Sequence, residues 1–154
     1  MHPSILQASH YVEQHGSGVW MRPDYEGIPY SDGDRIEDEI EEVIDSCADR
    51  GVHSAELARH LDTWAKKYHL SAGRGHLLRP LEHLLRGKSV LEIGAGCGAI
   101  TRYLGEAGAE VVALEGSPRR ARICRKRTQG LASVQVVCER FGDFAVAGQF
   151  DVVT

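Results

Sequence analysis

Apolar residues recur at helical spacing through the first half of the chain. Over residues 35–48 one face is apolar and acidic side chains fill most other positions, which predicts an amphipathic helix. The same spacing resumes after Ser54, a residue type that caps helix N-termini. A glycine-rich break at residues 71–75 separates this second helix from a shorter, leucine-rich helix over residues 77–85. We therefore expect a helical segment over residues 35–86.

Beyond residue 87 the pattern changes to short apolar runs between turn signals, which predict buried strands. Stretches of helical spacing separate these runs, as in a parallel sheet with right-handed crossovers. The expected strands span residues 89–93, 110–115, 134–137 and 150–153, and the helices span residues 99–107 and 118–128. The resulting fold class is α/β and Rossmann-like, with about four parallel strands in residues 87–154.

Residues 1–34 have no sustained period and are rich in Gly, Pro, Asp and Tyr, so we expect an irregular lead segment. The Asp-Gly-Asp turn at residues 32–34 marks the start of the first helix. The aromatic residues Trp20, Tyr25 and Tyr30 suit two roles, stacking on a sugar or packing the segment on the core. The sequence leaves both roles open.

The charge of the chain is unevenly distributed, although its net value is only −4. Residues 1–50 carry 3 Lys and Arg against 12 Asp and Glu, whereas residues 51–154 carry 15 against 10. This asymmetry is compatible with a nucleic-acid partner, and equally with packing of the acidic part on the basic part. The basic residues at 119–127 lie all round the expected helix, which favours a solvated helix face over a surface that follows phosphates.

The length of 154 residues is enough for one domain. The four cysteines form no C-x-x-C pair and no zinc-ligand spacing, so we expect reduced thiols, no metal and a cytoplasmic location. No apolar run approaches the ~20 residues that span a bilayer. The first residues do not have the pattern of a signal peptide, so we expect no membrane association.

The segment from Glu92 to Gly98 reads Glu-Ile-Gly-Ala-Gly-Cys-Gly and lies between an expected strand and an expected helix, as nucleotide-binding loops do. Gly94 allows a sharp turn, while Gly96 and Gly98 let the backbone lie against a ligand and the helix pack close to the strand. Read as G-x-G-x-x-A, the loop also fits a nicotinamide dinucleotide. Glu92 favours S-adenosylmethionine (SAM), because dinucleotide folds keep an apolar residue there and an acid can hold the amino-acid end of SAM.

Glu115 ends the second expected strand, 21 residues after Gly94. Its two oxygens can accept both ribose hydroxyls, a device that both cofactor classes use. The alternative interpretation makes Glu92 and Glu115 surface acids at strand ends. Their shared spacing around three glycines favours a nucleoside site.

Three segments resemble motifs of the class I SAM-dependent methyltransferases. Residues 90–104 resemble motif I, residues 112–117 motif II and residues 150–153 the start of motif IV, and the overall resemblance covers roughly residues 68–154. It implies SAM as the cofactor. The full fold of the class has seven strands, so we expect residues 87–154 to be its N-terminal half, with the catalytic residues beyond Thr154 and the activity of this chain alone left open.

The resemblance also implies roles in the cofactor site. Where the class places an Asp on the adenine amino group, Glu139 could serve one residue out of register, with Phe141 on the adenine ring. The helical segment often forms a lid in this class, so Arg74 suits either the SAM carboxylate or helix-end packing. The expected cofactor residues are Glu92, Gly94, Ala95, Gly96, Gly98, Glu115, Gly116, Ser117, Glu139, Phe141, Tyr68 and Arg74.

Within the class, residues 68–71 and 74–81 resemble bacterial methyltransferase domains found with glycosyltransferases of surface-polysaccharide synthesis. This implies a small or saccharide-linked acceptor, with a glycosyltransferase domain as a candidate partner. Two alternatives remain: residues 92–101 also resemble ribosomal RNA adenine dimethyltransferases, and the fold could bind SAM without turnover. The acidic first third argues against a nucleic-acid acceptor.

Overall fold

The computed structural model describes residues 10–146 and 148–154. The strands in chain order are β1 (Val12–Glu13), β2 (Val19–Met21), β3 (Ser89–Ile93), β4 (Glu110–Glu115), β5 (Val134–Cys138) and β6 (Val152–Val153). The helices are α2 (Asp34–Ser46), α3 (Ala55–Ala58), α4 (Trp64–Leu70), α5 (Gly73–His76), α6 (Ala99–Glu106) and α7 (Pro118–Arg127), with 3-10 turns η1 (Arg79–Leu84) and η2 (Phe141–Asp143).

The centre of the fold is a sheet with the strand order β1-β2-β5-β4-β3-β6. Strands β5, β4, β3 and β6 are parallel neighbours and correspond to the four strands that the sequence predicts. Val90, Val112 and Val136 in these strands are fully buried, as expected for a parallel sheet inside a protein. The α/β, Rossmann-like prediction is confirmed.

The lead segment corrects one part of that prediction. Residues 1–34 are not irregular throughout, because β1 and β2 form an antiparallel pair and β2 adds to β5 in parallel. Among the residues that the structure describes, the sheet therefore has six strands, of which β1 is antiparallel to its neighbour. Strands of two and three residues are too short to produce a visible alternation of apolar and polar positions.

Three expected boundaries also change. The helix expected after Ser54 is divided into α3 and α4, and Thr63 begins the second piece by accepting a hydrogen bond from the Lys66 amide at 3.2 Å. Ser54 caps α3 as predicted, through the Leu57 amide at 3.2 Å. The expected break at residues 71–75 instead contains the start of α5. The last strand begins at Val152 rather than two residues earlier.

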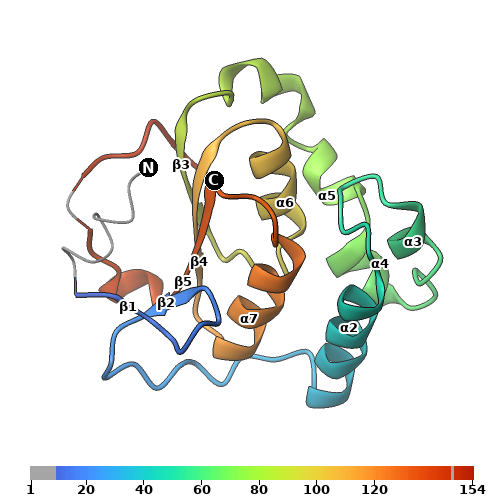
Figure 1. Cartoon of the computed structure of the whole chain (residues 1–154), viewed down its shortest axis with the longest axis horizontal. Coiled ribbons are helices and arrows are strands. Elements are labelled where there is room, and N and C mark those ends of the chain that lie inside the picture. Colours follow the sequence, from blue (N-terminus) through green and yellow to red (C-terminus); the bar gives the residue numbers. More distant parts are fainter. Residues whose placement is uncertain (1–9, 147) are drawn as a thin grey trace.

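The helices form two layers beside the sheet. Figure 1 shows α6 and α7 along the sheet, with α2, α3 and α4 farther from it. Helix α2 packs on α7, and α5 packs on α6. The helical segment expected over residues 35–86 therefore packs on α6 and α7, the two helices that follow β3 and β4.

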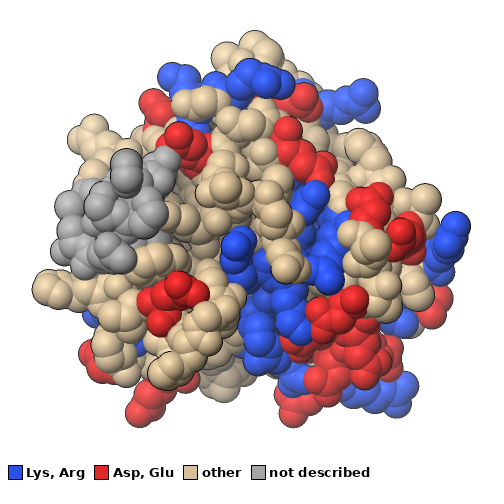
Figure 2. Space-filling model, viewed as in Figure 1, with Lys and Arg blue, Asp and Glu red and all other residues tan. Residues whose placement is uncertain are grey.

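The interface between α2 and α7 is ionic. Arg119 pairs with Asp34 and Asp38, and Lys126 lies 2.9 Å from Glu41 and 2.5 Å from Asp45. Figure 2 shows the acidic side chains over α2 beside the basic side chains over α7. Of the two interpretations of the charge asymmetry, packing of the acidic part on the basic part is thus realised in the structure.

Within residues 10–146 and 148–154, no helix combines the length and the apolar character needed to cross a bilayer. All four cysteines are buried free thiols.

Candidate functional site

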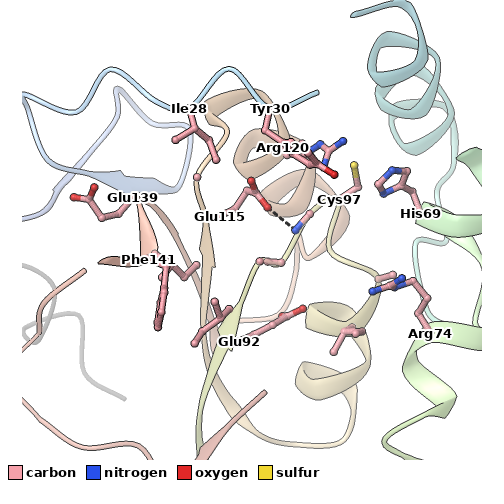
Figure 3. A pocket seen from close by; sticks show the side chains of 18 of the residues that line it. Ile28, Tyr30, His69, Arg74, Glu92, Cys97, Glu115, Arg120, Glu139 and Phe141 are labelled. Carbon is pink, nitrogen blue, oxygen red and sulfur yellow. Dashed lines mark hydrogen bonds between the residues drawn. The ribbon is translucent and has the colours of Figure 1, made fainter. Parts of the chain in front are cut away.

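A cavity of about 450 Å³ lies at the carboxyl ends of β3 and β4. Segments distant in the sequence line it: the lead segment, helices α4 and α5, the glycine loop and the residues after β5. Of the expected cofactor residues, all except Gly98 and Ser117 belong to this lining. Figure 3 shows these side chains gathered around one space.

The glycine loop turns out of β3 through left-handed residues, with φ of +75° at Gly94 and +55° at Gly96. The amides of Gly94 and Ala95 both donate to the Leu114 carbonyl, at 2.8 and 3.0 Å, which fixes the loop to the end of β4. A Cβ added at Gly94 or Gly96 would meet no atom within 4 Å. These glycines therefore supply the turn and leave the cavity side of the loop open.

Gly98 and Ser117 have structural roles outside the cavity. A Cβ at Gly98 would lie 3.1 Å from the Cys124 Cα atom, so the glycine allows α6 to begin against α7. The Ser117 hydroxyl accepts a hydrogen bond from the Arg120 amide at 3.5 Å and caps α7. Gly98 allows the close helix packing that the sequence predicts, while neither residue lines the cavity, and their part in cofactor binding stays a prediction.

The Glu115 carboxylate is held at the end of β4 by two backbone amides. Its Oε2 accepts from Gly96 and its Oε1 from Ser117, both at 2.8 Å. Each carboxylate oxygen can accept a second hydrogen bond, so the group can still bind a pair of hydroxyls. The glycine loop and the acid therefore form one preorganised unit.

Glu92 is a buried acid in the cavity wall. Burial raises the pKa of its carboxyl group to about 7, while a hydrogen bond from Thr101 and the charge of Arg74 act in the opposite direction. Within the described residues its Oε2 atom has no hydrogen-bond partner. A buried carboxyl with a free oxygen is favourable for a ligand ammonium group, because that partner would offset the cost of desolvating the charge.

Arg74 and Tyr68 form the side of the cavity opposite β5. The Arg74 guanidinium lies over the Tyr68 ring, 4.2 Å from its centroid, and Tyr68 stacks on Trp64 at 5.1 Å. Trp64 is 71% exposed. This row of planar groups leads from solvent to the cavity and places a permanent positive charge near Glu92.

Glu139, at the other end of the cavity, is fully buried and already engaged. Its Oε2 lies 2.5 Å from the Arg22 Nε, and its Oε1 accepts from the Arg140 amide at 2.8 Å. Phe141 is 62% exposed and lines the cavity beside it. The contacts of Glu139 make it an anchor for the lead segment, and its proposed role at the adenine amino group stays a prediction.

The sequence interpretation missed several lining residues. Arg120 looked like part of a solvated helix, yet it is buried, with Tyr30 4.6 Å from its guanidinium. His69 looked like an ordinary polar position, yet its Nε2 lies 2.7 Å from the Asp32 carboxylate, which Arg120 also contacts at 2.8 Å. Burial lowers the pKa of His69, which favours its neutral form. Ile28 gave no sequence signal at all.

Residues 90–154 match the family model described as a methyltransferase domain. No curated protein sequence matches the chain. This match supports the class predicted from the sequence, because the residues that resemble motif I, motif II and the start of motif IV all lie within the matched range.

Several solved methyltransferases are structurally similar to part of the chain. Coclaurine N-methyltransferase bound to N-methylheliamine and S-adenosylhomocysteine has a TM-score of 0.50 at 18% identity, over 80% of this chain and 42% of that chain. Arabidopsis thaliana protein arginine methyltransferase 10 has a TM-score of 0.49 at 24% identity, over 63% and 30%. Magnesium protoporphyrin IX methyltransferase from Synechocystis PCC 6803 has a TM-score of 0.48 at 18% identity, over 64% and 50%. The chain spans half or less of each protein.

Proposed function

We propose that the chain binds SAM in the cavity at the ends of β3 and β4 and serves methyl transfer to a small or saccharide-linked acceptor. One observation carries the first part. The cavity joins a buried acid with a free oxygen, Glu92, to a second acid held by the glycine loop, Glu115. This pairing suits a ligand with an ammonium group at one end and vicinal hydroxyls in the middle.

Each group has a role in that arrangement. Glu92 would accept the ammonium group, and Arg74 would pair with the carboxylate of the same amino-acid end. Glu115 would accept the ribose hydroxyls through its remaining lone pairs. The match of residues 90–154 to a methyltransferase domain supports SAM over a nicotinamide dinucleotide.

SAM supplies a methyl group on a sulfonium, which is already activated toward displacement. The protein must align an acceptor with that group and exclude water. A hydroxyl acceptor also needs a base to take its proton. We assign no residue of this chain to that role.

The acceptor is inferred from surface chemistry. Trp64, Tyr68 and Phe141 are exposed aromatic residues, and Tyr68 and Phe141 also line the cavity. Flat apolar faces suit the hydrophobic side of a sugar ring. Together with the resemblance of residues 68–71 and 74–81, this supports a saccharide-linked acceptor in bacterial glycan synthesis, with a glycosyltransferase domain as a candidate partner.

Calorimetric titration with SAM, S-adenosylhomocysteine and NAD tests the cofactor. We expect binding of both sulfur nucleosides and none of NAD, and the reverse result would refute the proposal. Glu115→Ala should weaken binding by about 1.5–3 kcal/mol, because charge-assisted hydrogen bonds are lost. Glu42→Ala removes an exposed acid of α2 outside the cavity and should bind like the wild type.

Transfer of labelled methyl groups tests the acceptor. The chain is incubated with labelled SAM and with nucleotide sugars, glycolipid intermediates or total RNA. Label on a saccharide supports the proposal. Label on RNA alone would favour the ribosomal RNA methyltransferase alternative, and SAM binding without any transfer would favour a non-catalytic module.

A further inference from the structure

The lead segment crosses the carboxyl end of β4 directly beside Glu115. The carbonyl of Gly116, the next residue, accepts hydrogen bonds from the Tyr25 hydroxyl at 2.8 Å and from the Ile28 amide at 3.1 Å. Two donors from the lead segment thus meet at one backbone atom. Residues 25–28 therefore lie over the end of β4, next to Glu115, the residue expected to bind the ribose.

The contact between the lead segment and Gly116 is tight. A Cβ at Gly116 would lie 2.5 Å from the Ile28 Cδ1 atom, so the Ile28 side chain occupies the space that any larger residue would need. A Cβ at Gly27 would lie 2.6 Å from the Pro118 ring at the start of α7. Two glycines, one on each side of this contact, therefore allow Ile28 to reach the cavity wall.

Both ends of this crossing are anchored. Before it, β2 pairs with β5 and Arg22 lies 2.5 Å from the buried Glu139 carboxylate. After it, Asp32 contacts both His69 and Arg120. The position of Ile28 is thus fixed by the sheet on one side and by α4 and α7 on the other.

Ile28 lies at the end of the cavity away from Arg74. Figure 3 shows Ile28, Glu139 and Phe141 on the side of Glu115 opposite Arg74. Ile28 and Phe141 are apolar, and the Glu139 carboxylate between them is already engaged by Arg22. This end is therefore suited to a flat, weakly polar ring.

We propose that Ile28 forms an apolar wall of the nucleobase subsite and that Tyr25 positions it, so that the lead segment is part of the cofactor site. The proposal rests on SAM binding in this cavity. If Glu115 binds the ribose, Ile28 beside Gly116 adjoins the nucleoside half of the ligand. Recognition of the base then depends on packing between Ile28 and Phe141.

Binding of two ligands distinguishes the nucleoside half of the site from its amino-acid half. S-adenosylhomocysteine contains both the nucleoside and the amino acid, whereas 5′-methylthioadenosine lacks the amino acid. Ile28→Ala should weaken binding of both by the same factor, about tenfold, because the lost apolar contact lies on the shared half. Tyr25→Phe keeps the ring but removes the hydrogen bond to Gly116, and should weaken both about threefold.

Matched variants define the comparison. Arg74→Ala should weaken S-adenosylhomocysteine and leave methylthioadenosine unchanged, because its guanidinium faces the other end. Val12→Ala truncates an exposed apolar residue of the lead segment outside the cavity and should change neither affinity. Circular dichroism confirms that each variant is folded.

Three results would overturn the proposal. Wild-type affinity of Ile28→Ala for both ligands would remove Ile28 from the site, and a loss confined to S-adenosylhomocysteine would place it at the amino-acid end.

Photolabelling of the wild-type chain with an azidoadenosine analogue gives a readout without mutation. Label at residues 25–30 or 139–141 supports the proposal, and label only near Arg74 contradicts it. A wild type that binds neither ligand refutes the proposed function itself.

Discussion

Arg120 on α7 donates a hydrogen bond to Glu37 on α2 over 2.7 Å, and both side chains are buried. Asp32 contacts the same guanidinium at 2.8 Å. Two acids that precede the Rossmann-like domain, Asp32 and Glu37, therefore pair with Arg120 of that domain at the edge of the cavity. Burying an ion pair costs desolvation free energy, so each partner depends on the other for compensation.

Removal of Glu37 should be strongly destabilising. Glu37→Ala leaves a buried guanidinium with one acid fewer, and we expect a loss of about 3 kcal/mol in the free energy of unfolding. The double variant Glu37→Leu with Arg120→Met should recover most of that loss, because neither charge remains. Arg122→Ala is the control: its pair with Glu41 is half-exposed, so it should cost under about 1 kcal/mol. Equal losses for Glu37→Ala and Arg122→Ala in urea unfolding would show that burial adds nothing to this contact.

Glu92 should make stability depend on pH. Burial raises the pKa of its carboxyl from 4.5 to about 7, so between these values the folded chain holds a proton that the unfolded chain releases. Protonation of Glu92 thus stabilises the folded chain relative to the unfolded chain. This contribution is fully present below about pH 4.5 and is lost as the pH rises through 7. Its size is on the order of 3 kcal/mol.

Comparison with Glu92→Gln isolates this effect, since the other titrating groups are shared. We expect the stability of Glu92→Gln relative to the wild type, measured as the difference in free energy of unfolding, to increase as the pH rises from about 4.5 to 7.5. A constant difference across this range would show that the folded carboxyl titrates normally.

The last two glycines of the loop, Gly96 and Gly98, should separate an effect on binding from an effect on folding. Gly98→Ala places a Cβ 3.1 Å from the Cys124 backbone at a φ of +83°, so we expect a loss of about 2–3 kcal/mol in stability. Gly96→Ala meets no atom within 4 Å, and its φ of +55° should cost about 1 kcal/mol. Because Gly96 lines the cavity, its variant should lose affinity for S-adenosylhomocysteine while remaining folded. Thermal melts and calorimetry on both variants measure the contrast, which a greater stability loss at Gly96 would contradict.

The basic residues of α7 should not bind RNA. Arg119, Arg122 and Lys126 each contact an acid of α2, so few charges remain for phosphates. In a mobility-shift assay near 150 mM salt we expect no complex with structured RNA. Replacement of Glu41 and Asp45 by Ala frees Lys126 and should create weak, salt-sensitive binding. Tight RNA binding by the wild type would reverse this interpretation.

The sequence predicted the parts of the fold whose signals are local. The strand before Gly94, the glycine turn and the acid at Glu115 follow one another within about two dozen residues, so spacing alone indicated their relation. The resulting cavity contains them as predicted.

Other features depend on distant partners and gave no such signal. Ile28 reaches the cavity only because Gly116 and Gly27 permit a close approach. The burial of Arg120 depends on Glu37, 83 residues earlier. One clue was available: acids of α2 at 37, 41 and 45 recur every fourth residue, and they meet the basic residues of α7.

The pairing of β2 with β5 also sets an order of events during synthesis. Val19 pairs with Val136, so the segment that leaves the ribosome early must wait for more than a hundred further residues before its partner exists. Translation at about 5–20 residues per second makes this a delay of many seconds. Throughout that interval β2 has no β5 to pair with, so the lead segment joins the sheet and the wall of the cavity only as a late step of folding.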